Sequence, residues 1–93
     1  MAYGNRNSGI DTVSALGAAV LDARRAAGLR QRDLATLAGV SPAWIVRLER
    51  AQSTNIELGR LFRVLQALGL TIELQTGHVS EADAAAALIL GKP

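Results

Sequence analysis

The chain of 93 residues contains no cysteine, only two prolines and only three aromatic residues. Without cysteine it has neither disulfide bonds nor thiolate metal sites, which is compatible with a reducing, cytoplasmic compartment. Tyr3, Trp44 and Phe62 are too few to supply the stacking platforms on which single-stranded nucleic acids bind. No apolar run approaches membrane-spanning length, and no secretory signal pattern is present. We therefore expect a soluble cytoplasmic protein without a membrane partner.

The chain also lacks the residue patterns of a catalytic or metal site. His78 is its only histidine, and no second metal-type ligand stands at a useful spacing from it. No P-loop, nucleophile elbow or paired-carboxylate arrangement occurs. We expect no enzymatic activity, no cofactor and no metal.

Positive charge is concentrated in the middle of the chain. The whole chain has a net charge of +2, but the segment 24–63 holds eight arginines against Asp33, Glu49 and Glu57, a net charge of +5. A local excess of this kind attracts a phosphate backbone and makes binding weaken with salt. Hydrophobic residues make up 49% of the chain, enough for one small core and one domain.

The segment 31–50 has the pattern of two short helices joined by a tight turn. The first ends at Gly39, and the second begins at Ser41 and Pro42, a favourable N-cap followed by a favourable first helical residue. Ile45 and Leu48 define the inward side of the second helix. By this phase the outward side holds Ala43, Trp44, Val46, Arg47 and Arg50. A helix docked by its apolar side and exposed elsewhere has the shape that enters a DNA major groove.

Periodicity elsewhere predicts two more helices that share one core. One begins after Asp11 or Thr12, either of which can cap it, and runs to Ala27 before Gly28. Its inward residues are Leu16, Ala19, Val20, Ala23 and Ala27. The other spans about 56–68 with Thr54 or Asn55 as its cap, and its inward residues are Leu58, Leu61, Phe62 and Leu65.

After Gly69 the apolar period changes from 3.6 to 2, which predicts a short strand at 71–76. A lone strand leaves backbone groups unpaired, and the nearest candidate partner is the same strand of a second copy. We expect a homodimer whose interface comprises Leu70, Thr71, Ile72, Glu73 and Leu74. The domain organisation is then a flexible arm at 1–10, a helical domain at 11–70, the strand, and a tail at 77–93 with a short helix near 81–90.

The pattern from Gly28 to Arg50, G-L-x-Q-x-x-L-A-x-x-A-G-V-S-x-x-x-I-x-x-L-E-R, resembles the Xre/Cro class of helix-turn-helix proteins. The resemblance implies an all-α, lambda-repressor-like fold of four to five helices, here with one short C-terminal β-strand that pairs across a dimer. It further implies an ion pair between Arg24 and Glu49. The glycine that usually follows the recognition helix in this class is Ala51 here, so we expect the turn after that helix to differ slightly.

Proteins of this class bind double-stranded operator DNA, so the resemblance also implies which residues contact DNA. Phosphate contacts fall on Arg30, Gln31 and Arg50, with Ser41 as a further contact beside its capping role. Base edges are reached from Pro42, Ala43, Val46 and Arg47. Only Arg47 of these can donate hydrogen bonds from its side chain, with guanine as its natural target. Trp44 is expected either against the sugar-phosphate backbone or in the core. Local hydrogen bonding remains the alternative for Gln31, and a phosphate contact remains the alternative for Arg47.

The second half of the chain, with L-x-x-L-F-x-V-L-Q-A-L-G-L followed by T-I-E-L, is similar to the HipB-type antitoxins within this class. That similarity implies a bacterial, nucleoid-associated repressor of its own operon that also binds a HipA-like toxin kinase. Two alternatives stay open at this point. One is a stand-alone Xre-family or phage-type repressor, and the other is a protein-interaction adaptor on the same scaffold.

Overall fold

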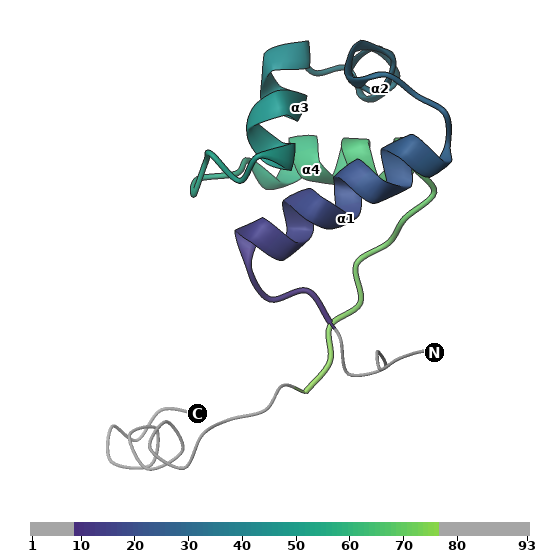
Figure 1. Ribbon diagram of the computed structural model, residues 1–93. Coiled ribbons are helices and arrows are strands. Elements are labelled where there is room, and N and C mark those ends of the chain that lie inside the picture. The colour runs from purple at the N-terminus through teal and green to yellow at the C-terminus, as the bar shows by residue number, and fades with distance from the viewer. Residues whose placement is uncertain (1–8, 77–93) are drawn as a thin grey trace, which may run out of the picture.

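The computed structural model describes residues 9–76, which contain four helices and no strand (Figure 1). The helices are α1 Val13–Ala26, α2 Gln31–Ala38, α3 Pro42–Glu49 and α4 Leu58–Ala67. α2 packs against both α3 and α4, and α1 packs against α3. None of these helices is long and apolar enough to cross a membrane. The expected arm up to residue 8, and the expected tail helix with His78, lie outside the described residues.

Side-chain caps begin three of the helices, and two of these caps were predicted. Thr12 Oγ1 accepts from the Ala15 amide over 3.0 Å at α1, and Ser41 Oγ accepts from the Trp44 amide over 3.1 Å at α3. The prediction for α4 was wrong, because its cap is neither Thr54 nor Asn55. Glu57 accepts from the Arg60 amide over 2.9 Å, so α4 begins at Leu58.

All four helices end in the same Schellman arrangement of hydrogen bonds, in which a residue with positive φ follows the helix. Three of these residues are glycines, namely Gly28, Gly39 and Gly69. The fourth is Ala51, with a φ of 55° after α3, where the amides of Ala51 and Gln52 bond to the carbonyls of Leu48 and Arg47. A side chain in this conformation costs roughly 1–2 kcal/mol, so the end of α3 is strained.

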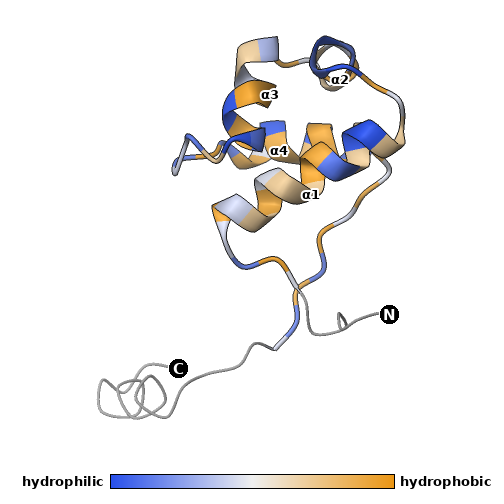
Figure 2. Ribbon diagram, in the orientation of Figure 1, coloured by the Kyte–Doolittle hydropathy of each residue, from blue (hydrophilic) through white to orange (hydrophobic). Residues whose placement is uncertain are grey.

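The core lies where α2 and α3 meet the inner faces of α1 and α4. It consists of Val20, Leu34, Ala35, Ala38, Trp44, Ile45, Leu48, Leu61, Val64 and Leu65. Figure 2 shows that the connection between α3 and α4 is, by contrast, mostly hydrophilic. The predicted inward faces of α4 and α1 were partly wrong. Leu61 and Leu65 of α4 are buried as predicted, but Leu58 and Phe62 are 57% and 44% exposed, and Val64 is buried in their place. Ala27, which follows the last residue of α1, is exposed.

Trp44 is also buried, so the expectation that it is exposed by helical phase was wrong. Its exposed fraction is 9%. Trp44 stands four residues before Leu48, which places both on one side of α3, and Ile56 of the following connection lines the same small cavity. The inward side of α3 is therefore wider than the stripe that Ile45 and Leu48 define. Of the two positions expected for Trp44, the structure shows the one in the core.

α1 approaches the end of α3 at Gly17, which is buried. A Cβ built on this residue would lie 2.9 Å from the carbonyl oxygen of Glu49 and closer still to that of Leu48. Both atoms belong to backbone and cannot turn aside. Glycine is therefore required here for α1 and α3 to pack at this distance.

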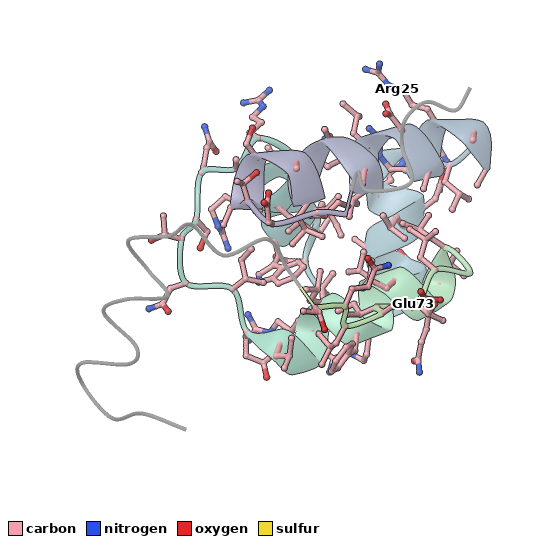
Figure 3. All side chains as sticks on the ribbon, turned by 90° about the horizontal axis from the view of Figure 1, so that it is seen from below. Arg25 and Glu73 are labelled. Atoms are coloured by element: carbon pink, nitrogen blue, oxygen red, sulfur yellow. The ribbon has the colours of Figure 1, made fainter. Side chains whose placement is uncertain are left out.

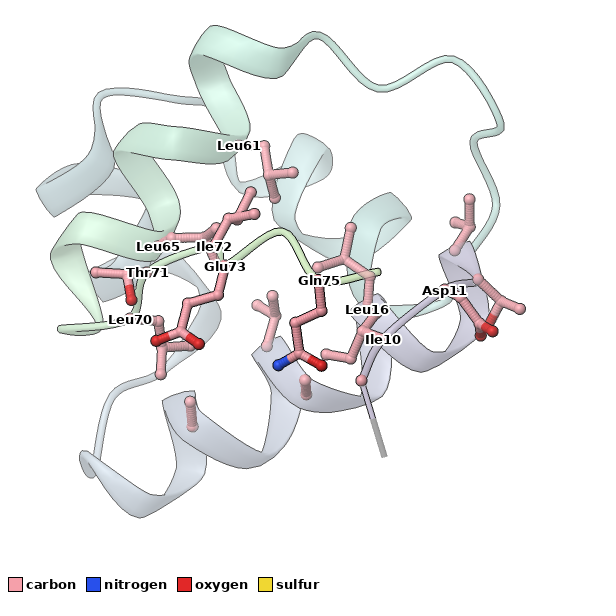
Figure 4. Close-up of a pocket in the computed structure, with 16 residues that line it drawn as sticks. Ile10, Asp11, Leu16, Leu61, Leu65, Leu70, Thr71, Ile72, Glu73 and Gln75 are labelled. Atoms are coloured by element: carbon pink, nitrogen blue, oxygen red, sulfur yellow. The ribbon is translucent and has the colours of Figure 1, made fainter. Parts of the chain in front are cut away.

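The segment that follows α4, residues 70–76, has no secondary structure within the single described chain. Leu70 is half-buried, whereas Ile72 is 45% exposed and Leu74 is 95% exposed. The segment lines an apolar groove of about 760 Å³ between α1 and α4 (Figure 4). Leu61 and Leu65 line the groove from α4, and Leu16 and Val20 line it from α1. The predicted strand is thus absent from the isolated chain.

Candidate nucleic-acid interface

The outward side of α3 presents most of the residues that the sequence predicted for DNA contact. Ser41, Pro42, Ala43, Arg47 and Arg50 are exposed, and Val46 is half-buried. Trp44, Ile45 and Leu48 hold the opposite side in the core. Three buried side chains therefore fix the docking of α3. Its outer surface is free, and a helix of this kind can enter a DNA major groove.

Arg47 is the one hydrogen-bond donor among the expected base-contacting side chains. Within residues 9–76 it forms neither an ion pair nor a hydrogen bond through its guanidinium. It lines a cavity of about 180 Å³ beside Trp44, and the other lining residues are Leu48, Ser53, Asn55, Ile56, Glu57 and Arg60. The Arg47 side chain is thus exposed and has no carboxylate partner within the described residues.

This cavity brings in four polar residues that were not among the predicted contacts. Ser53, Asn55 and Glu57 belong to the α3–α4 connection, and Arg60 lies in the first turn of α4. Small polar residues in a loop that follows a recognition helix are a usable signal, but the sequence alone suggested only a cap. The position of Arg60 beside Arg47 depends on the fold of the connection and carries no local signal.

At the end of α3, Glu49 joins three helices through a buried network. Arg24 Nε donates to Glu49 Oε2 over 2.6 Å and Arg24 Nη2 donates to Glu49 Oε1 over 2.9 Å, so the ion pair expected between these residues is present and bidentate. Arg24 Nη1 also donates to the Leu29 carbonyl over 2.9 Å. The hydrogen bonds and charge of Glu49 raise the pKa of Arg24 above its ordinary value, against the opposing effect of burial. The network fixes α3 relative to α1.

Gln31, the first residue of α2, is part of the same network. Its Nε2 donates to Glu49 Oε1 over 3.0 Å, which orients the side-chain amide because a carboxylate only accepts. This bond spans 18 residues of sequence and joins α2 to α3, so it is not the local hydrogen bond that was the alternative for Gln31. The second Nε2 hydrogen remains to donate to a phosphate, and the side-chain oxygen can accept from solvent, so the bond to Glu49 does not preclude a DNA contact.

Arg30, the other expected phosphate ligand on α2, is paired with Asp33. Asp33 accepts from the Arg30 amide over 2.9 Å and from the guanidinium over 3.0 and 3.1 Å. The hydrogen bonds of Arg30 lower the pKa of Asp33 to about 2. Two-thirds of the Arg30 side chain is exposed. Solvent-exposed ion pairs of this kind contribute little, so a phosphate can replace Asp33 as the partner of Arg30.

A fold with an exposed second helix of a helix-turn-helix pair defines the class of DNA-binding transcriptional regulators. The chain matches the helix-turn-helix domain family over residues 6–77. It is also 40% identical over 65 residues to an HTH-type transcriptional regulator, y4mF, of Sinorhizobium fredii, covering 70% of this chain and 84% of that protein. The chain therefore belongs to the helix-turn-helix domain family, is of the Xre type, and is not an enzyme.

Two solved structures refine this similarity. HipB in the HipA-HipB-O2-O3 complex superposes with a TM-score of 0.67 at 29% identity, covering 74% of this chain and 96% of that one. The restriction-modification controller protein C.AhdI from Aeromonas hydrophila superposes with a TM-score of 0.60 at 29% identity, covering 63% and 88%. The similarity to HipB expected from the second half of the sequence is thus present in the fold.

Proposed function

We propose that the chain is a sequence-specific repressor that binds double-stranded operator DNA as a homodimer in the bacterial cytoplasm, on the nucleoid. The observation that carries this proposal is Arg47, exposed and unpaired within the described residues on the outer side of α3. An unpaired guanidinium at this position can donate two parallel hydrogen bonds to the O6 and N7 of guanine. Pro42, Ala43 and Val46 beside it offer apolar contacts, such as to a thymine methyl group.

Phosphate contacts would surround this base-contacting surface. Gln31 and Arg30 stand at the start of α2, Ser41 stands at the start of α3, and Arg50 stands at its end. The net charge of +5 over residues 24–63 supports the same assignment, since it lies on the segment that contains α2 and α3. Contacts of this type position a protein on DNA without reading its sequence, and they make affinity fall with salt.

The homodimer would form through residues 70–74 beside the groove between α1 and α4. Leu74 is 95% exposed in the single chain, an unfavourable position for a leucine that dimerisation would relieve. Pairing the two segments across a two-fold axis would satisfy their backbone groups and set the distance between the two copies of α3. That distance must match successive major grooves. The segment would therefore determine which spacing of operator half-sites the dimer can bind, as well as holding the dimer together.

We further propose that the protein is the antitoxin of a HipBA-type module, repressing its own operon and binding a HipA-like kinase. The similarity to HipB over 74% of the chain supports this assignment. The similarity to C.AhdI favours the second candidate, a stand-alone Xre-family or phage-type regulator with no toxin partner. The two candidates differ in one test, which is whether the product of an adjacent kinase-like reading frame co-purifies with this chain. The adaptor alternative differs from both because it predicts no DNA binding.

The DNA-binding proposal is tested by titrating Arg47→Ala against an operator selected by the wild-type protein and against random DNA. We expect the preference for the operator to fall by about 1–3 kcal/mol, centred on one base position, with the fold intact. Arg25→Ala is the matched control, since it removes the same charge from an exposed residue that points away from the domain (Figure 3). An Arg47→Ala protein that keeps the wild-type preference would exclude Arg47 from base recognition.

A further inference from the structure

α2 has no basic residue of its own in its last turn. The cation at this end comes from another helix, because Arg63 of α4 donates its Nε to the carbonyl oxygen of Ala38 over 3.0 Å. The C-terminal end of a helix carries partial negative charge on its free carbonyls, which a guanidinium stabilises by hydrogen bonding and by charge. Ala38 is 3% exposed, so its carbonyl has little access to water as a substitute.

Arg63 also lies against the turn that joins the two helices of the DNA-binding unit. A Cβ built on Gly39 would stand 4.0 Å from Arg63 Nε. Gly39 has a φ of 71°, and two residues further on Ser41 caps α3. The bond from Arg63 is therefore made at the last residue of α2, immediately before the turn that sets the direction of α3.

We propose that Arg63 is a positioning residue for DNA recognition, which holds the turn between α2 and α3 and so orients Arg47 toward base edges. The proposal rests on the proposed function of Arg47. It assigns Arg63 a role that differs from that of a phosphate ligand, although both roles use a cation. A phosphate ligand would strengthen binding to every DNA sequence alike, whereas a positioning residue changes the preference for the operator.

The first experiment uses the free protein, so it does not depend on DNA. Amide hydrogen exchange is measured in wild-type, Arg63→Ala and Arg63→Lys proteins. The amide of Val40 bonds to the Ala35 carbonyl at the end of α2, and the amide of Leu29 bonds to the Arg24 carbonyl in the equivalent place at the end of α1. We expect Arg63→Ala to speed exchange at Val40 by about three- to tenfold, the equivalent of one lost hydrogen bond, while Leu29 keeps its rate.

Arg63→Lys keeps the positive charge at the end of α2 without the planar guanidinium, and we expect it to restore part of the protection at Val40. It also serves as the folded comparison if the alanine variant is too unstable to study. Equal exchange at Val40 in wild-type and both variants would overturn the proposal, because the turn would then be held without Arg63.

The second experiment compares operator and random DNA. We expect Arg63→Ala to lower the operator-to-random affinity ratio about three- to tenfold, with partial recovery in Arg63→Lys. The control Arg25→Ala should lower both affinities equally. Equal losses on both DNAs for Arg63→Ala would also overturn the proposal and identify Arg63 as a phosphate ligand. A wild-type protein without operator preference would instead contradict the proposed function, and the exchange at Val40 would still decide the role of Arg63.

Discussion

Gln31 Nε2 donates to Glu49 Oε1 over 3.0 Å, and this bond ties the first residue of α2 to the last residue of α3. Glu49 is at the same time the partner of Arg24 in the ion pair between α1 and α3. A side chain expected to contact phosphate is thus held by the group that fixes the recognition helix. In the proposed DNA complex, a phosphate bound by Gln31 and the α3 helix in the groove would therefore both depend on this one carboxylate.

Replacing Gln31 with alanine should weaken binding to operator and random DNA alike, by about 1 kcal/mol, because one phosphate hydrogen bond is lost and no base contact changes. Titrations at several salt concentrations measure both affinities. Gln66→Ala, at an exposed glutamine of α4, is the control and should bind as wild type. A loss confined to the operator would show instead that Gln31 acts through Glu49 on the orientation of α3.

Local chemistry explains which parts of the fold the sequence predicted well. Thr12 and Ser41 were found as caps because a hydroxyl before an apolar helical pattern is a local signal, and Gly28 and Gly39 were found as helix ends for the same reason. The side of a helix that is buried depends on its neighbours. Trp44 was misplaced because the α3–α4 connection, which no periodicity describes, completes its surroundings.

Contacts between distant residues were predictable only where a family resemblance supplied them. The pair of Arg24 and Glu49 is 25 residues apart in sequence and came from the resemblance. The bond from Arg63 to Ala38 has the same separation but no corresponding motif, so it could not be predicted. The strained φ of Ala51 could not be derived either: the absence of the usual glycine suggested a different turn, but α3 ends in the same arrangement as the other helices and the alanine takes the positive φ.

Replacing Ala51 with glycine should stabilise the protein by about 0.5–1 kcal/mol. Glycine adopts the φ of 55° without the strain of a side chain, and this gain exceeds the greater freedom of glycine in the unfolded chain. Denaturant unfolding measures the change. The matched control is Gly28→Ala, which introduces a side chain into the equivalent conformation after α1, with no atoms nearby to clash, and should destabilise by a similar amount. No gain in Ala51→Gly would mean that the conformation after α3 is not costly.

Replacing Gly17 with alanine should destabilise the protein by about 2 kcal/mol, because the new methyl group would meet the backbone carbonyls of Leu48 and Glu49. A decrease in melting temperature on the order of 10 °C is expected for a domain of this size. Gly59→Ala in α4 is the control. There the nearest atom is a carboxylate oxygen of Glu57, which can move, so the better helix propensity of alanine should leave stability unchanged or higher. Equal stability of the Gly17 variant and wild type would disprove the close approach of α1 to α3.

Replacing Leu74 with aspartate separates the proposed dimer contact from the stability of the single chain. Leu74 is 95% exposed in the single chain, so the substitution should leave monomer unfolding nearly unchanged. If two copies of Leu74 become buried in the dimer, their loss removes about 3 kcal/mol or more, and the dimer dissociation constant measured by sedimentation equilibrium should rise at least ~100-fold.

Leu58→Asp makes the matching change at a residue of α4 that is 57% exposed and lies outside the proposed interface. We expect this protein to remain dimeric and to bind operator DNA as wild type does. The Leu74 variant should lose tight operator binding together with its dimer, since a single copy of α3 reaches only one half-site. The reverse result, with dissociation caused by Leu58→Asp and not by Leu74→Asp, would place the interface on α4. The segment 70–74 would then have no part in setting the distance between recognition helices.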